Sequence, residues 1–242
     1  MTGLKLSVVI PVFNEAENIG VLAAEIDQAL GHISYEMIFV NDASTDDTKE
    51  KLRALKAEYA ALRVISHRHN AGQSRALRTG ILAAGAPFIA TLDGDGQNDP
   101  ADIPALYNAL IRSAAPDNLA MIGGRRAKRR DSQAKKLASK VGNSVRKYML
   151  KDGADDTGCG LKLFRREAFL RLPYFDHMHR YIPALMQREG YMCEYVDVNH
   201  RPRQFGQSKY TNFGRLLVSF ADLRGVMWLG RRARNPQGWD EL

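Results

Sequence analysis

The chain has 242 residues, of which 45% are hydrophobic and 26% are charged, as in an ordinary globular protein with a sizeable core. Its formal net charge of +8 favours an anionic partner, such as a phosphorylated ligand, an anionic membrane surface or nucleic acid. The two cysteines, Cys159 and Cys193, lie far apart, which argues against a disulfide framework and is typical of a reducing cytosolic setting.

The first half of the chain alternates strand and helix patterns. Short apolar runs predict strands at 6–12, 37–40, 62–66, 88–92 and 119–122, because a strand covered on both faces reads as a continuous apolar segment. Apolar residues at helical spacing predict helices at 14–30, 45–59, 72–84 and 102–112, the second with Ser44 as its N-cap. Repeated β-α units of this length predict an α/β fold with a mainly parallel central sheet and helices on both faces.

The second half is less regular. It predicts an amphipathic helix at 135–150, a strand within 157–164, a short helix at 181–189, a strand at 194–198 and a helix at 212–223. We expect residues 1–210 to form one domain and residues 211–242 to form a C-terminal helical extension with a basic tail. The apolar run 216–229 is short and contains Asp222 and Arg224, so no transmembrane segment is expected, and residues 1–6 do not resemble a signal peptide.

The most informative segment is 93–97 (DGDGQ), directly after the predicted strand 88–92. Asp93 and Asp95, followed by the amide of Gln97, offer oxygen ligands to one hard cation, Mg²⁺ or Mn²⁺, with a substrate's phosphates completing the shell. A surface turn rich in aspartate and glycine is the alternative interpretation. Because the segment 93–97 directly follows a strand that is expected to be buried, the metal site is the favoured interpretation.

Polar groups also follow the first two predicted strands, in the segments 11–15 (PVFNE) and 41–46 (NDASTD). Ligands of parallel sheets bind beyond the carboxyl ends of the strands, where a carboxylate can accept a hydrogen bond from a base or a ribose. Glu15 could instead belong to a first helical turn and Asp42 could cap a helix. Three acidic strand ends on one edge favour a nucleotide site, although no G-x-G-x-x-G or Walker-type motif is present.

Basic residues concentrate in two places. Between Arg125 and Lys151 there are eleven lysines and arginines and a single acidic residue, Asp131, and three more arginines follow the apolar cluster 226–229. A solvated helix face is the alternative interpretation of such a run. The density and single sign of the charge favour a polyanionic partner.

The segments 11–15, 41–46, 70–72 (NAG) with 78–80 (RTG), and 93–97 resemble, in order, the motifs of family 2 glycosyltransferases, which bind nucleotide sugars with a Rossmann-like GT-A fold. The later segments 124–125 (GR), 156–160 (DTGCG) before 163–165 (LFR), and 203–209 (RQFGQSK) resemble the dolichol-phosphate mannose synthase branch. The resemblance spans roughly residues 6–210. It implies a metal-dependent transfer of a hexose from a GDP- or UDP-hexose to a polyprenyl phosphate of the dolichyl or undecaprenyl type, and we hypothesise a single displacement that inverts the anomeric carbon.

The resemblance also implies roles for individual residues. Donor binding would involve Pro11, Phe13, Glu15, Val40, Asp42, Asp93, Gly94, Arg203 and Lys209. The metal ligands would be Asp95 and Gln97, the catalytic residues Asp93, Asp95 and Arg125, and the acceptor-phosphate contacts Arg125, Lys135 and Ser139. Three positions depart from the common pattern, because Phe13 replaces a frequent tyrosine, Lys135 an arginine found in some relatives, and Cys159 a usual serine.

The acceptor chemistry separates the alternatives. A lipid monophosphate has a second pKa of about 6 and is therefore an anion near neutral pH that needs no protein base. A family 2 enzyme that acts on a saccharide hydroxyl needs such a base, for which Asp99 is the nearest candidate. A nucleic-acid-binding protein would explain the basic segment but not the acidic strand ends, and a catalytically dead scaffold would not need an intact Asp93, Asp95 and Gln97.

We expect a cytoplasmic protein that is peripheral on the inner face of the membrane and binds no nucleic acid. Docking would use basic side chains with the apolar cluster 226–229, or a separate membrane subunit. The alternative for Trp228 is that it packs on the core of the domain.

Overall fold

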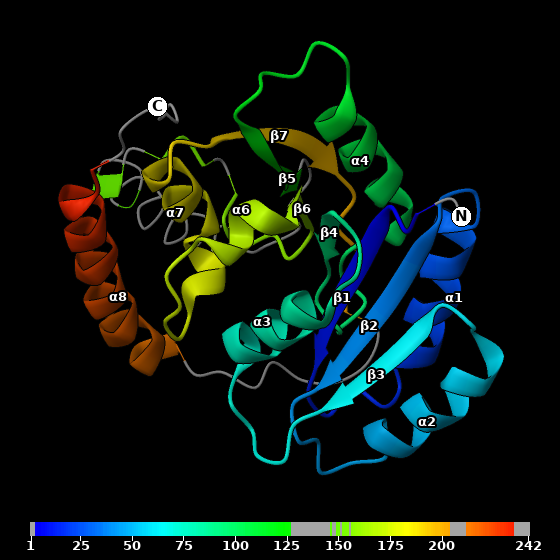
Figure 1. The fold of residues 1–242 in the computed structure, drawn as a ribbon. Helices are drawn as coiled ribbons and strands as arrows, with labels where there is room; N and C mark the ends of the chain where they lie inside the picture. Colours follow the sequence, from blue (N-terminus) through cyan, green and yellow to red (C-terminus); the bar gives the residue numbers. More distant parts are fainter. Residues whose placement is uncertain are drawn as a thin grey trace, which may run out of the picture.

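The structure is a computed structural model that describes residues 3–126, 146, 149–150, 152–154, 156–203 and 212–234, with the side chains of 212–219 excepted. The described strands are β1 (Leu6–Val12), β2 (Tyr35–Asn41), β3 (Leu62–Ser66), β4 (Phe88–Thr91), β5 (Leu119–Arg126), β6 (Lys162–Arg165) and β7 (Met192–Val198). They form one sheet in the order β3-β2-β1-β4-β6-β5-β7 (Figure 1).

The sheet is mainly parallel, as predicted. β1 pairs in parallel with β2 and β4, β2 with β3, and β5 with β7. β6 alone among these strands runs antiparallel, inserted between β4 and β5. Because β1 has β2 on one side and β4 on the other, the strand order reverses between β1 and β4, and ligands of open α/β sheets bind beside such a reversal.

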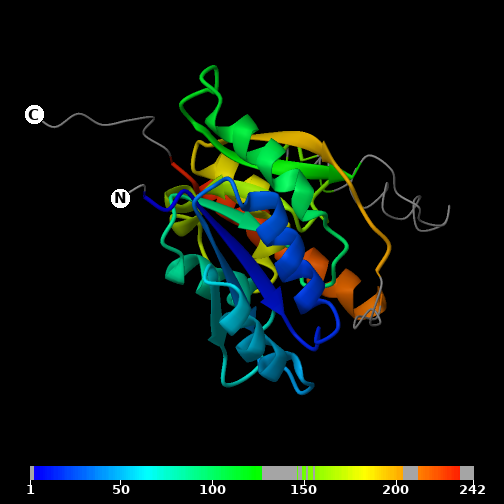
Figure 2. The ribbon, with the colours of Figure 1, turned by 90° about the vertical axis from the view of Figure 1, so that its right-hand side faces the viewer.

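Helices cover both faces of the sheet. One face carries α1 (Ile19–Leu30), α2 (Thr48–Glu58) and α4 (Ile103–Ile111), with the 3₁₀ turn η1 (Pro100–Asp102) leading into α4. The other carries α3 (Gln73–Ala83), α6 (Arg166–Leu170), the 3₁₀ turn η2 (Met178–Arg180), α7 (Ile182–Arg188) and α8 (Asn212–Arg232). Seen from the side in Figure 2, α1, α2 and α4 lie in front of the sheet.

The strands are apolar throughout because each of their faces is covered. All seven residues of β1 are buried, and its side chains alternate between the two cores. Val8 and Ile10 pack in the core under α1, whereas Val9 packs in the core under α3. This alternation explains why the sequence shows a continuous apolar run rather than a period of two.

Some predicted boundaries differ from the structure. The first helix begins at Ile19 and not at residue 14, because residue 14 takes a positive φ of 53° that no helix allows. Ser44 does not cap α2, which begins at Thr48 with Asp47 at the N-cap position. Ser44 instead accepts a hydrogen bond from the Asn14 N–H at 2.9 Å, so the two loops are joined.

The C-terminal helix is longer than predicted and ends at Arg232. Apart from residues 146, 149 and 150, the helix predicted at 135–150 lies outside the described residues, as does the boundary predicted at residue 210. None of the helices in the described part of the chain is long and apolar enough to cross a membrane.

Candidate active site

The acidic loop after β4 is held by its own amide groups. The Gln97 N–H donates to Asp95 Oδ1 at 3.1 Å, and the Asp93 N–H donates to the buried Asn98 Oδ1 at 3.2 Å. Gly96 makes the turn with φ +71°, a conformation that glycine adopts without strain. The loop therefore presents Asp93, Asp95 and Gln97 together at the carboxyl edge of the sheet, next to the end of β1.

Asp93 is half-buried at the start of this loop. Gln73, the first residue of α3, donates its side-chain amide to Asp93 Oδ1 at 2.8 Å. Burial, with a smaller contribution from the charge of Asp95, raises the pKa of Asp93 to about 6, although Lys162 and Arg126 act in the opposite direction. Asp93 thus titrates close to neutrality, unlike an ordinary surface aspartate.

Asp95 forms an ion pair with Arg203, which follows β7 and lies 108 residues away in the sequence. The carboxylate is largely buried, with 9% of the residue exposed, and a buried carboxylate requires a nearby positive charge. The guanidinium of Arg203 supplies that charge. The structure therefore joins a predicted metal ligand to a predicted contact of the donor diphosphate.

The residues present fit an open divalent-cation site. Asp95 and Gln97 offer a carboxylate and an amide oxygen, which are the hard ligands that Mg²⁺ and Mn²⁺ prefer. Within the described ranges, no group of three or more Asp, Glu, His or Cys side chains forms a closed cage for an ion. A cation held by so few protein ligands needs oxygens from a substrate, such as a diphosphate.

The loops after β1 and β2 are connected to each other. The Asn14 side chain accepts from the Thr45 N–H at 2.8 Å, and the Glu15 N–H donates to Thr48 Oγ1 at 2.9 Å. The Glu15 carboxylate accepts from the Asn18 amide at 2.7 Å. These contacts fix the loop that contains Phe13 and Glu15 against the loop that follows β2.

Asp42 is buried, and its carboxylate is satisfied within the protein. Oδ1 accepts from the Ala71 N–H at 2.9 Å and lies 2.7 Å from His67 Nδ1, while Oδ2 accepts from the Gly72 N–H at 2.8 Å. A carboxylate only accepts, so His67 Nδ1 donates to Asp42, and His67 Nε2 lies 2.9 Å from the hydroxyl of Thr79. Asp42 thus orients the loop that leads into α3, and its contact with a base stays a prediction.

Pro11 and Val40 lie opposite each other on the paired ends of β1 and β2. The Val40 side chain is fully buried in the core under α3, so only its main chain can face a nucleoside. Gly94 is packed against Val12 and the Pro11 carbonyl, where a Cβ atom would lie 3.0 Å from that oxygen. The loop after β4 therefore contacts the end of β1, where the strand order reverses.

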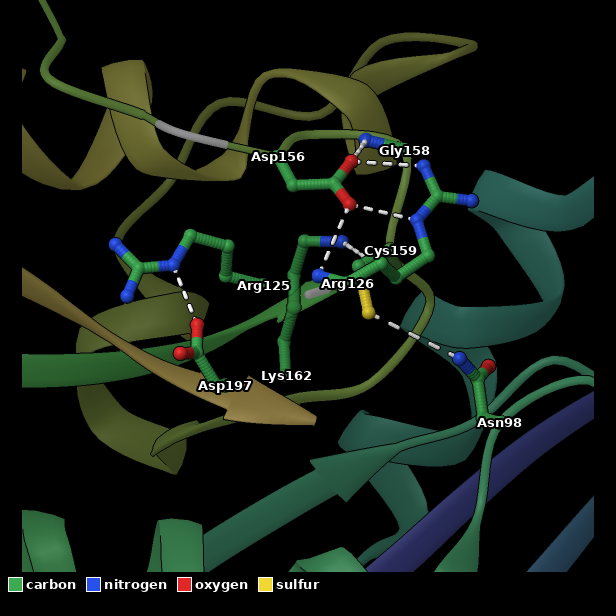
Figure 3. Close-up of polar contacts among 8 residues, drawn as sticks. All are labelled: Asn98, Arg125, Arg126, Asp156, Gly158, Cys159, Lys162 and Asp197. Atoms are coloured by element: carbon green, nitrogen blue, oxygen red, sulfur yellow. Dashed lines mark hydrogen bonds and ion pairs between the residues drawn. The ribbon is translucent and has the colours of Figure 1, made fainter. Parts of the chain in front are cut away.

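The two arginines at the end of β5 point in different directions (Figure 3). Arg125 donates from Nε to Asp197 Oδ1 at 2.6 Å in an exposed pair. Arg126 is largely buried and binds Asp156 in a bidentate manner, with Nε 2.6 Å from Oδ2 and the terminal nitrogen 2.8 Å from Oδ1. The charge of Arg126 lowers the pKa of Asp93, so Arg126 acts electrostatically on the acidic loop. The catalytic role of Arg125 stays a prediction.

A buried lysine, Lys162, lies close enough to Asp93 to lower its pKa. Lys162 lies on β6 and donates its ammonium group to the Cys159 carbonyl (Figure 3). Burial lowers the pKa of Lys162, while the neighbouring charges of Asp93 and Asp156 oppose that change. Burial also raises the pKa of the Cys159 thiol, so this cysteine is a packing residue that contacts the Asn98 amide at 3.9 Å.

Sequence reasoning missed several residues that surround Asp93. These are Gln73, Asn98, Arg126, Gly160 and Lys162. The sequence did contain an indication of the role of Lys162, because a single charged residue inside the apolar run 161–164 requires a polar partner if it is buried. The others depend on contacts between distant segments. Lys135, Ser139 and Lys209 lie outside the described residues, so their predicted roles remain predictions.

Comparison with known proteins gives a family and a fold. A model described as glycosyl transferase family 2 matches residues 7–172. Dodecaprenyl-phosphate galacturonate synthase from Rhizobium johnstonii is 35% identical over 96% of this chain and 69% of its own length. Undecaprenyl-phosphate 4-deoxy-4-formamido-L-arabinose transferase from Photorhabdus laumondii is 33% identical over 90% of this chain and 66% of its own length. The chain thus spans about two thirds of these curated relatives.

Two groups of solved structures are also similar. Glucosyl-3-phosphoglycerate synthase from Mycobacterium tuberculosis, in complex with Mn²⁺, UDP and phosphoglyceric acid, has a TM-score of 0.69 at 17% identity and covers 97% of this chain and 81% of its own. The mannosyltransferase PcManGT from Pyrobaculum calidifontis, in complex with GDP-Man and Mn²⁺, has a TM-score of 0.65 at 17% identity over 96% and 66%. This likeness shows the fold, which is the GT-A fold expected from the motifs.

Proposed function

Because the chain belongs to glycosyl transferase family 2, we propose that it transfers a hexose from a GDP- or UDP-linked donor to a polyprenyl phosphate. The names of the two curated relatives support the acceptor, since both include a prenyl phosphate. The nucleotide ligands and the Mn²⁺ or Mg²⁺ in complexes of the two structural neighbours support the donor and its cation.

The observation that carries the proposal is the meeting of Asp95 and Arg203 at the reversal of strand order. Asp95 and Gln97 would hold the cation, which when bound offsets the negative charge on a departing diphosphate. Arg203, once released from Asp95, has the planar fork that binds phosphate oxygens in a bidentate manner. A ligand for the cation and a ligand for the phosphate are thus placed side by side.

The state of the nearby carboxylates favours an acceptor that is already an anion. Both oxygens of Asp156 are engaged, since Arg126 binds each of them and the Gly158 N–H donates to Oδ1 at 3.2 Å. Asp99 caps the turn η1 by accepting from the Ala101 N–H at 3.1 Å. Asp156 is thus committed to structural contacts and one oxygen of Asp99 to the cap, so neither contact prepares a base for a sugar hydroxyl. A lipid phosphate, with a second pKa of about 6, needs no such base.

We place the protein on the cytoplasmic face of a membrane, as a peripheral protein. The acceptor is a membrane lipid whereas the donor is soluble, so the site must work at a surface. Inversion at the anomeric carbon is expected, because a phosphate oxygen that attacks the donor directly displaces the diphosphate in one step. The anomeric configuration of the product, determined by NMR, tests this point.

The test of the function uses the purified chain with a panel of GDP- and UDP-sugars and a short polyprenyl phosphate, with Mg²⁺, Mn²⁺ or a chelator. We expect a lipid-linked sugar phosphate from one donor, no product with the chelator, and no product from Asp95→Asn. The matched control is Glu194→Gln, which removes a half-exposed ion pair with Arg112 far from the acidic loop. Transfer to saccharide acceptors but to no polyprenyl phosphate contradicts the proposal.

A further inference from the structure

The helix α8 lies on the outside of the molecule and packs on α7 with one face (Figure 1). Leu223 and Val226 are buried in the core under that face, and the Leu229 carbonyl accepts from Arg188 Nε at 3.2 Å. Val226, one of the apolar residues expected to dock on a membrane, is therefore part of the core. That expectation is wrong for Val226, because the helix turns this side chain inward.

The opposite face of α8 combines aromatic and cationic side chains. Phe220 and Trp228 are 55% and 60% exposed, which excludes packing of Trp228 on the core. Arg224, Arg231 and Arg232 are also exposed. At the helical rotation of 3.6 residues per turn, these five side chains fall within an arc of about 120°. We call this set the aromatic-arginine face.

We propose that the aromatic-arginine face of α8 binds the surface of a bilayer that contains anionic lipids. Aromatic rings are favoured at the boundary between headgroups and acyl chains, and arginines are attracted to anionic headgroups. The charge of the face is complementary to such a surface. Asp222 is the single acidic residue between residues 220 and 234, and it turns away toward His177, with its Oδ2 3.3 Å from the ring Nδ1.

The helix α8 is linked to the active site through the turn η2, since Asp222 of α8 contacts His177. The turn that contains His177 also contains His179, whose Nδ1 lies 2.8 Å from the Ser74 hydroxyl at the start of α3. The neighbouring residue Gln73 binds Asp93. This inference rests on the proposed function, which supplies the reason for a membrane contact. Docking of α8 on lipid therefore keeps the site, which is joined to α8 through η2, near the surface where a prenyl phosphate lies.

The first experiment measures sedimentation of the chain with vesicles of pure phosphatidylcholine and with vesicles that also contain phosphatidylglycerol. We expect binding to the anionic vesicles that weakens with added salt. The triple variant Arg224→Gln, Arg231→Gln, Arg232→Gln should bind about 100-fold more weakly, from about fivefold for each arginine near the surface. The double variant Phe220→Ala, Trp228→Ala should bind at least about tenfold more weakly.

The matched control is the double variant Leu82→Ala, Ile111→Ala, which removes two exposed apolar side chains from other surfaces, 54% and 46% exposed. Its vesicle binding should equal that of the unchanged chain. In a Trp239→Phe background, Trp228 fluorescence should shift to the blue with anionic vesicles and become protected from acrylamide. The proposal is overturned if the folded protein does not bind anionic vesicles, or if the triple arginine variant and the double aromatic variant both bind them as well as the unchanged chain does.

A parallel assay in detergent with a short, water-soluble prenyl phosphate separates this inference from the proposed function. Variants of the aromatic-arginine face that lose vesicle binding should keep transfer there, because no bilayer is involved. Binding that requires a membrane protein in the vesicles, and not lipid alone, also overturns the docking proposal. Unchanged vesicle binding together with no transfer from any donor counts against the proposed function and leaves the docking face standing.

Discussion

Gly160 offers the sharpest test of how the site is built. A Cβ atom at this position would lie 2.2 Å from Asp93 Oδ2 and 2.7 Å from Asn98 Oδ1, whereas real Cβ contacts are essentially never under 3.0 Å. The main chain cannot easily retreat, since the Gly160 carbonyl accepts from the Thr91 hydroxyl at 2.8 Å. Gly160→Ala therefore pushes the Asp93 carboxylate away by nearly 1 Å and strains its bond with Gln73.

We expect Gly160→Ala to lower kcat/KM by about 100-fold, because a misplacement of about 1 Å in a catalytic constellation has an effect of that size. Overpacking should lower the free energy of unfolding by about 1–3 kcal/mol, which leaves the protein folded at room temperature. Steady-state kinetics with the preferred donor and thermal unfolding measure the two effects separately. The metal affinity of the folded variant, compared with that of the unchanged protein, shows whether the site has changed in addition to the stability of the fold.

The control is Gly20→Ala in α1, where a Cβ atom would meet nothing within 4 Å. That variant should keep full activity and gain up to about 1 kcal/mol in stability, because alanine is the better helix former. If Gly160→Ala keeps kcat and KM within threefold of the unchanged protein, the close approach of Gly160 does not position a carboxylate that the reaction uses, and the predicted role of Asp93 is refuted.

Three further perturbations follow from two ion pairs of the site and from the raised pKa of Asp93. Arg203→Gln removes the cation beside Asp95, so Mn²⁺ should bind more tightly in the absence of donor, while the affinity for the donor should fall about 10- to 100-fold. Calorimetry measures both affinities, and an unchanged metal affinity contradicts the pairing of Arg203 with Asp95. Asp156→Asn leaves the buried Arg126 uncompensated and should cost about 3 kcal/mol, seen as a lower urea midpoint; a midpoint equal to that of the unchanged protein contradicts this. Asp93 has a pKa of about 6 when folded and about 4 when unfolded, so the folded state binds more protons between these pH values and its stability falls as pH rises through them. Asp93→Asn should therefore raise the melting temperature near neutral pH but not near pH 4, and a gain of equal size at both pH values contradicts this.

Local pattern was enough for the strands and for their polar ends. β1 and β3 have the predicted bounds, because a strand buried on both faces leaves an uninterrupted apolar run. The motifs around residues 11–15, 41–46 and 93–97 were readable because each lies within a few residues of a strand end. Helix starts were less accurate, since the hydrogen bond from Asn14 to Ser44 that shapes the first loop joins residues 30 apart.

The sequence by itself determined the α/β class, the edge where the site lies and the acidic loop at its centre, because these follow from short apolar runs and the residues just after them. The tertiary structure decided which groups surround Asp93 and Asp95. Only the antiparallel insertion of β6 brings Lys162 and Gly160 to Asp93, and only the path after β7 brings Arg203 to Asp95. Such contacts join segments tens of residues apart, and they depend on strand order and burial, which no local periodicity records.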